Sequence, residues 1–211
     1  MDEFTLICAA VRASYARVGR PGCVIAALSG GADSVLLLRA LRTLREETPF
    51  ELRVVHVNHG LRENAALDET FCRELCAKWH IPLAVFHVQV DSHGSTEDAA
   101  RRARYAAFEQ AMPAGQAAVL ALAHHMDDQA ETVLMHLIYG SGMAGLSGMR
   151  ELSGAFWRPL LSVRRTQIRD ALMALHQPWR EDESNQDTAY TRNHLRARAL
   201  PALEQANASA V

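Results

Sequence analysis

The sequence contains a single lysine, Lys78, so its remaining basic side chains are all arginines. Its apolar runs are short, which excludes a segment long enough to span a bilayer. The first residues, MDEFTL, are acidic and lack a basic region or cleavage site, so we expect no secretory signal. The net charge of −2 provides no overall basic surface for nucleic acid. We therefore expect a cytoplasmic protein that binds no membrane.

Cysteine is also scarce, and none of the four cysteines forms a CxxC pair. Cys72 and Cys76 lie one helical turn apart within an amphipathic pattern. That spacing favours packing in the core over a metal site or a disulfide.

Short apolar runs alternate with amphipathic segments along the chain. We expect strands at residues 23–28, 52–57, 83–90 and 117–123. Helices are expected at residues 2–18, 32–46, 63–79, 127–139, 166–176 and 192–204, with another starting near residue 95. This alternation predicts an α/β fold with a doubly wound, mostly parallel sheet and a short helical C-terminal extension.

Two further features concern the organisation of the second half. The glycine-rich segment GSGMAGLSGM, residues 140–149, predicts a flexible loop. We expect residues 1–150 to form a catalytic core. Residues 151–211 are expected to continue the same domain, with a substrate flap and the start of a helical linker.

Unusual polar segments follow three of the expected strands. They are SGGADS after the first, HVNHGLR after the second and AHHMDDQAET after the fourth. Ligands of doubly wound sheets bind at the carboxyl ends of the strands, where parallel strands bring these segments to one edge. Their convergence predicts one site.

SGGADS has the composition of a phosphate-binding turn. Gly30 and Gly31 let the backbone approach an anion, and Ser29 and Ser34 add hydroxyl donors. Asp33 would repel a phosphate unless the two share Mg²⁺. The patterns GxxxxGK[ST] and GxGxxG are both absent. A plain strand–helix turn is the alternative.

AHHMDDQAET places Asp127, Asp128 and Glu131 at the start of a helix. A carboxylate at this position ordinarily interacts with the helix dipole alone. Three carboxylates beside two histidines exceed that need and suit a cation, either Mg²⁺ or a substrate ammonium group.

Other polar groups admit two interpretations. His59 and Arg62 could meet a nucleobase or phosphate, or simply cap the sheet. Arg101 and Arg104 share one side of a helix, where arginines are usually solvated. The segment EDESNQDTAYTRNHLRARALP, residues 181–201, fits a substrate flap or a polar surface loop. Residues 150–198 contain nine arginines and six acidic residues, an excess of positive charge.

These segments resemble a known family. SGGADS is similar to the SGGxDS loop of the PP-loop ATP pyrophosphatases, which cleave ATP between the α and β phosphates. Within that superfamily the chain resembles the bacterial tRNA(Ile)-lysidine synthetases over residues 20–203. The matching segments, in family order, are HVNHGLRENA, AARRARYAAFE, LALAHHMDDQAETVLMHLIYGSGMAGLSGM, RPLL and EDESNQDTAYTRNHLRARALP.

The resemblance implies an ATP-dependent ligase that adenylates C2 of the wobble cytidine in the CAU anticodon of tRNA(Ile). Free L-lysine then displaces AMP to give lysidine. ATP is the implied nucleotide and Mg²⁺ its metal. The sequence leaves a homodimer open.

The resemblance also implies roles for matched residues. Asp128 and Glu131 would bind the lysine, and Asp127 would assist Asp33 with Mg²⁺. The ATP pyrophosphate would lie on Ser29, Gly30, Gly31, Ala32, Asp33 and Ser34. The catalytic set would be Asp33, Arg101, Arg104, His124 and Arg192. Contacts to tRNA would come from His59, Arg62 and Arg196.

Two departures from the family stand out. Glu183 occupies a position that is usually proline, and the C-terminal tRNA-binding domains of many members are absent from these 211 residues. Two alternatives therefore stay open: another PP-loop tRNA-modifying enzyme such as a thiolase, and a nucleotide-binding module without turnover.

Overall fold

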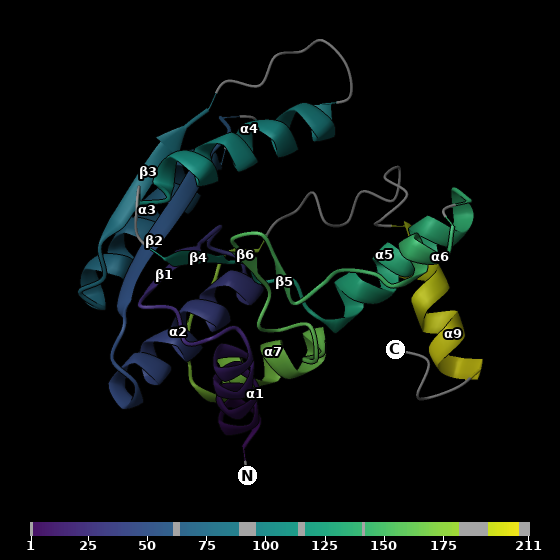
Figure 1. Ribbon diagram of the computed structural model, residues 1–211, viewed down its shortest axis with the longest axis horizontal. Coiled ribbons are helices and arrows are strands. Elements are labelled where there is room, and N and C mark those ends of the chain that lie inside the picture. The colour runs from purple at the N-terminus through teal and green to yellow at the C-terminus, as the bar shows by residue number, and fades with distance from the viewer. Residues whose placement is uncertain are drawn as a thin grey trace.

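A computed structural model describes residues 2–60, 64–88, 96–113, 117–140, 142–181 and 194–206. Its centre is a six-stranded sheet in the order β3-β2-β1-β4-β6-β5 (Figure 1). All neighbouring strands are parallel except β5 and β6. The strands are β1 (Cys23–Ala27), β2 (Glu51–Asn58), β3 (Leu83–His87), β4 (Ala118–Ala121), β5 (Leu152–Ser153) and β6 (Phe156–Trp157).

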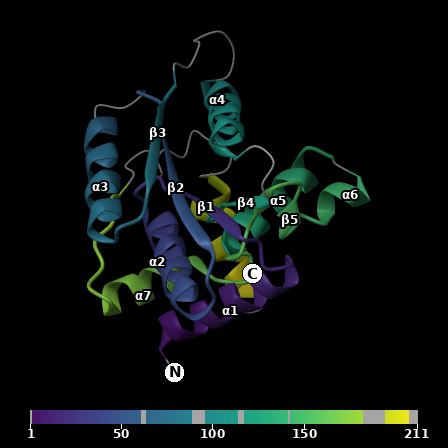
Figure 2. The same ribbon diagram turned by 60° about the vertical axis from the view of Figure 1, so that its left-hand side comes forward.

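Helices cover both faces of the sheet, as Figure 2 shows for α3 and α4 on either side of β3. The larger core cluster joins the sheet to α1 (Glu3–Arg17), α2 (Ala32–Glu47), α3 (Ala65–Lys78) and α7 (Arg165–Ala174). A smaller cluster packs α4 (Thr96–Ala111) on the opposite face. Strand β1 is almost wholly buried because apolar helices lie on both of its sides.

A group of helices extends from one end of the sheet. It consists of α5 (Met126–Ile138), α6 (Met143–Leu146), the π-helical η2 (Leu195–Ala199) and α9 (Leu200–Ala206). These helices lie together beyond β5 in Figure 1. α5 contacts both α6 and η2. Because α5 follows β4 in the chain, it connects this group of helices to the sheet.

The strand order creates one reversal point. From β1 the chain adds β2 and β3 on one side, and then returns to place β4 on the other side of β1. The loops after β1 and β4 therefore flank the crevice in which ligands of such sheets bind. These two loops carry SGGADS and AHHMDD.

The structure confirms the predicted doubly wound, mostly parallel sheet and the helical C-terminal extension. Strands β5 and β6 were missed because two-residue strands show no periodicity. The prediction of a loop throughout residues 140–149 was wrong, since α6 occupies part of that segment. No helix in the described residues is long and apolar enough to cross a membrane. The division at residue 150 stays a prediction.

Candidate active site

A pocket of about 490 Å³ opens at the reversal point between β1 and β4. Its volume falls in the range of small-molecule sites. Ten of the residues predicted for the site line it. They are Ser29, Gly31, Ala32, Asp33, Ser34, His59, Arg101, Arg104, His124 and Asp128.

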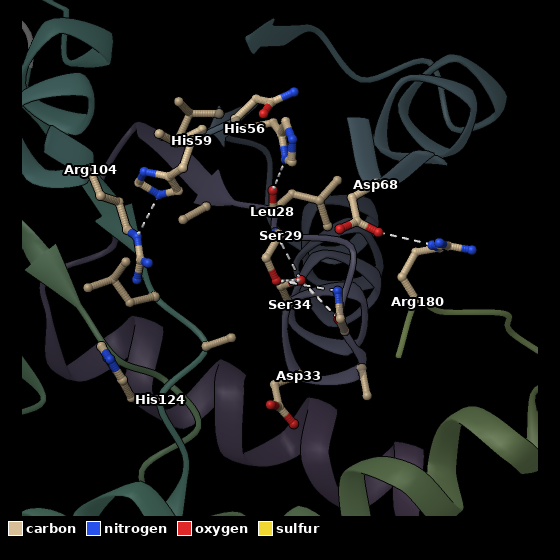
Figure 3. A pocket seen from close by; sticks show the side chains of 18 of the residues that line it. Leu28, Ser29, Asp33, Ser34, His56, His59, Asp68, Arg104, His124 and Arg180 are labelled. Atoms are coloured by element: carbon tan, nitrogen blue, oxygen red, sulfur yellow. Dashed lines mark hydrogen bonds and ion pairs between the residues drawn. The ribbon is translucent and has the colours of Figure 1, made fainter. Parts of the chain in front are cut away.

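The glycine loop is held in shape by its own serines. Ser34 Oγ accepts from the Ser29 amide at 3.2 Å and donates to the Gly31 carbonyl at 2.9 Å. The two hydroxyls lie 3.1 Å apart. Figure 3 shows the side chains of Ser29 and Ser34 next to each other in the loop. Gly30 has φ of +93°, a conformation that favours glycine. Gly31 is the N-cap of α2 and makes no side-chain cap, so the helix start offers backbone amides to an anion.

Asp33 has an oxygen without a protein partner. Its Oδ1 is buried and has no hydrogen bond among the described residues. Its Oδ2 lies 3.7 Å from His125 Nε2. Mg²⁺ in nucleotide sites binds one or two carboxylates and the substrate phosphates. Asp33 therefore fits a metal that lies on a phosphate held by the loop.

His125 joins the two polar segments, although the family resemblance favoured His124. The ring is 2% exposed and lies 3.5 Å from both Asp127 and Asp128. Burial alone would lower its pKa, but the neighbouring carboxylates of Asp127, Asp33 and Asp128 raise the pKa to about 10. The buried imidazolium thus balances carboxylates from both loops.

His125 is also the N-cap of α5, and its backbone N–H donates to Asp128 Oδ2 at 3.0 Å. In the reciprocal contact, the Asp128 amide lies 3.4 Å from His125 Nδ1. A protonated ring cannot accept that bond. The separation exceeds the usual 2.7–3.2 Å range, so the ion pairs dominate.

The acidic residues of α5 separate into two groups. Asp127 Oδ2 accepts the backbone N–H of Arg165 at 2.9 Å. Asp128 and Glu131 instead face Arg196, whose Nε and Nη2 lie 2.6 and 3.0 Å from Glu131. Glu131 is completely buried, and its burial beside a guanidinium satisfies the need to pair an internal charge. Asp127, Glu131, Arg196 and Gly30 do not line the pocket.

Three arginines that sequence reasoning missed line the pocket: Arg165, Arg169 and Arg180. The Arg180 amide donates to the Gly30 carbonyl at 2.9 Å, and its Nε lies 3.0 Å from Asp68. Arg169 pairs with Glu181 and keeps a buried Nε without a partner in the described structure. The excess of arginine after residue 150 was the available signal, but it did not show which arginines turn inward.

The end of β2 supplies two histidines. His56, also missed, is buried, and its Nδ1–H donates to the Leu28 carbonyl at 2.7 Å. Its buried Nε2 has no partner in the described part of the chain. His59 Nε2 lies 3.5 Å from Arg104 Nε. In Figure 3, Arg104 and His124 lie across the pocket from Arg180, with Ser29 and Asp33 between them.

Two predicted residues lie outside the described residues: Arg62 and Arg192. Within the described residues, no group of three or more His, Cys, Asp or Glu side chains could hold a metal by itself. Any metal here would need phosphate oxygens in addition to Asp33.

Residues 9–203 match the family of proteins that share the PP-loop domain. The chain belongs to this PP-loop family. It is 45% identical over 188 residues to a tRNA(Ile)-lysidine synthase from Enterobacter sp. (strain 638), which covers 86% of this chain and 44% of that protein. It is 47% identical over 189 residues to a tRNA(Ile)-lysidine synthase from Serratia proteamaculans (strain 568), and that alignment covers 86% of this chain and 43% of that protein. The chain spans less than half the length of these curated relatives.

Solved structures show that this PP-loop chain shares its fold with distant proteins. A U34-tRNA thiolase from Methanococcus maripaludis aligns with a TM-score of 0.76 at 18% identity, covering 99% of this chain and 74% of that one. An NH3-dependent NAD synthetase from Campylobacter jejuni aligns with a TM-score of 0.55 at 15% identity, covering 96% and 89%.

The cysteines of this PP-loop chain are poorly suited to sulfur chemistry. All four are free, and Cys23, Cys72 and Cys76 are buried. Burial raises the pKa of Cys76 to about 11 and raises that of Cys72 further. A thiolate is the reactive form of cysteine, so these thiols are inert at neutral pH.

Proposed function

We propose that this chain catalyses ATP-dependent formation of lysidine at the wobble cytidine of tRNA(Ile) with a CAU anticodon. The observation that carries the proposal is the junction formed by buried His125 between Asp33 of the glycine loop and Asp128 of α5. A nucleotide site and a cation site thereby adjoin one pocket. The names of the curated relatives supply the RNA and the amino acid.

In the first step, O2 of the cytidine attacks the α-phosphorus of ATP. A bond forms between O2 and the phosphorus, the bond to the β-phosphate oxygen breaks, and pyrophosphate leaves. The glycine loop and the amides at the start of α2 would hold the pyrophosphate. Arg169 and Arg180 line the same pocket and would stabilise charge on the phosphates. When bound, Mg²⁺ would be held by Asp33 and would neutralise phosphate charge.

In the second step, the ε-amino group of lysine attacks C2, the bond from C2 to O2 breaks, and AMP leaves with that oxygen. The ammonium group gives one proton to solvent before the attack, and the attacking nitrogen gives a second proton to solvent as the new bond forms. Asp128 lines the pocket and would attract the ammonium form of the incoming lysine. Glu131 lies behind Asp128 and shares Arg196 with it, so it would tune the charge at this point. Arg101, Arg104 and His124 would face the reacting base.

Thiolation by a PP-loop enzyme is the alternative, and the buried thiols disfavour it. The test is mass analysis of tRNA(Ile) after incubation with the chain, ATP, Mg²⁺ and lysine. We expect the mass gain of lysine on the wobble cytidine and stoichiometric AMP, both dependent on the CAU anticodon. A control tRNA with a different wobble base should gain no mass. AMP release without tRNA, or a product that contains sulfur, would contradict the proposal.

A further inference from the structure

A second pocket, of about 290 Å³, shares no residue with the first. Its lining contains two arginines, two serines and no carboxylate. The lining residues are Ser147, Gly148, Met149, Arg150, Ser153 and Arg158. This composition gives the pocket a positive charge, and the proposed reaction leaves the pocket unused.

Arg158 carries a buried charge without a counter-ion in the described structure. The residue is 9% exposed, and its Nη1 donates to the Arg150 carbonyl at 3.0 Å. Its Nε is buried and has no partner among the described residues. Buried charges in proteins are normally paired. The acid closest in sequence, Glu151, is instead bound by Arg17 at 2.6 and 3.0 Å. Among the described residues, the guanidinium of Arg158 therefore has no counter-ion, and an anion in the pocket would supply one.

The loop that forms the pocket is preorganised by α5. Gln129 Nε2 donates to the Met149 carbonyl at 2.8 Å, and the Met149 amide donates to Gln129 Oε1 at 2.6 Å. Gly148 has φ of +65°, and a Cβ at this position would lie 2.7 Å from Gln129 Oε1. The positive φ favours glycine, and a Cβ here would displace the Gln129 amide from its two bonds to Met149. The backbone next to Arg150 thus has a fixed position before any ligand binds.

We propose that this pocket binds a backbone phosphate of the RNA substrate, with Arg150 and Arg158 as its cationic contacts. The inference rests on the proposed function for its choice of RNA. Arg150 is exposed, so the pocket opens to solvent and can receive a phosphate that stays within a polymer. Arginine and hydroxyl side chains are common phosphate contacts in nucleic-acid complexes. Gln129 lies between Asp128 and Glu131 in α5, so a phosphate bound here would orient RNA relative to the acidic pair.

The test measures binding of tRNA(Ile), and of an unrelated RNA of equal length, to the full chain across a salt series. Arg150→Ala is the main variant because its exposed side chain can be removed without damage to the core. Arg158→Gln is a second variant, to be checked by thermal melting. Arg45→Ala, in the last turn of α2 at the end away from the glycine loop, is the matched control. ATP binding is measured in parallel.

We expect Arg150→Ala and Arg158→Gln to weaken binding of both RNAs about tenfold. The salt slope should fall by about 1 for each lost phosphate contact. ATP binding and the Arg45→Ala variant should be unchanged. Wild-type affinity and slope in Arg150→Ala would overturn the inference, as would an effect confined to tRNA(Ile), which would indicate base contacts. Lysidine formation by the unmodified chain tests the proposed function separately, because RNA binding is scored without turnover.

Discussion

At the scale of single residues, Asp33 is the side chain at which the proposed metal contact can be tested. Its Oδ1 has no partner in the described structure, and its ion pair with His125 is long, at 3.7 Å. Asp33→Asn removes a charge without creating a cavity. We expect AMP formation to fall by about 10²-fold or more, because the variant would lose the carboxylate that holds the metal, and with it the metal charge that neutralises the phosphates. The measurement is tRNA-dependent release of AMP over a Mg²⁺ titration.

Asp170→Asn provides the matched control, since Asp170 is an exposed carboxylate on α7. It should leave both AMP release and the Mg²⁺ dependence unchanged. Asp170→Asn should melt close to the unmodified chain, whereas Asp33→Asn loses the ion pair with buried His125 and should melt somewhat lower. If Asp33→Asn retains full turnover, Asp33 has no part in metal binding.

Glu131 and Arg196 form the buried pair whose disruption should cost most. Glu131 is fully buried, and Arg196 Nε lies 2.6 Å from its Oε1. Burial lowers the pKa of Arg196, but Glu131 and Asp128 outweigh that effect and raise it. Arg196→Met should therefore lower the free energy of unfolding by about 3–5 kcal/mol, because the carboxylate loses its guanidinium partner. Urea unfolding at neutral pH measures this loss.

The control is Arg53→Met, which breaks an exposed pair with Glu51 at 2.7 Å. Such a pair contributes less than about 1 kcal/mol. Adding Glu131→Gln to Arg196→Met should recover much of the stability by neutralising the buried carboxylate. Equal losses in Arg196→Met and Arg53→Met would show that Arg196 does not stabilise the buried charge.

At the scale of elements, the start of α5 couples folding to pH through His125. Its pKa is raised to about 10 in the folded protein, against an ordinary value of 6.5. A raised folded pKa gives stability that is complete below pH 6.5 and is lost as the pH rises toward 10. Between pH 6.5 and 8.5, we expect a loss of about 1 kcal/mol per pH unit.

Urea unfolding without Mg²⁺ at three pH values measures that slope. His125→Asn keeps a good N-cap but no titratable ring, so its slope should be much shallower. His80→Asn is the control, because His80 is exposed and has φ of +53°, which asparagine tolerates. If the free energy of unfolding falls with pH equally in the unmodified chain and in His125→Asn, the His125 ring does not cause the pH dependence.

The elements that the sequence predicted are those with long, unambiguous periodicity. The apolar run of β1 and the amphipathic α2 placed the glycine loop correctly, and strand alternation predicted the parallel sheet. Strands β5 and β6 escaped because two residues carry no pattern. The inward direction of Arg169 and Arg180 escaped for a different reason. It depends on how α7 and the segment after it pack against the sheet, which no local spacing encodes.

The same distinction applies to the two histidines before α5. Sequence position could not show that His125 turns into the protein, because its burial is set by the parallel bridge between His125 and Leu160 and by the position of Asp33. The resemblance to a family favoured His124, which does line the pocket. The polar residues at the end of each strand could thus be predicted from the sequence. The contact between His125 and Asp33, which joins two strand ends, depends on the tertiary fold and could not be predicted.

At the scale of the whole molecule, the fold gathers the proposed chemistry at one point. The return of the chain from β3 to β4 places the glycine loop beside the acidic start of α5. The described helices beyond the sheet then supply Arg196 to the acidic pair. The proposed nucleotide loop and the proposed cation site come from segments almost a hundred residues apart in sequence, and this arrangement would let them act on one substrate.

The same scale sets a limit on RNA affinity. The chain has a net charge of −2 and spans less than half the length of its curated relatives. RNA affinity depends on phosphates neutralised by basic side chains, so few contacts give weak binding.

We expect a Kd for tRNA(Ile) on the order of 10⁻⁶ M or weaker at physiological salt. Between 50 and 200 mM salt, kcat/KM for tRNA should fall with a shallow slope set by those few phosphate contacts. The KM for ATP should change little, because the proposed nucleotide site is a preformed pocket. Filter binding and initial rates over that range measure both quantities, with a tRNA of different anticodon as the control for specificity. Nanomolar binding that is indifferent to salt would show that recognition rests on base contacts rather than on charge.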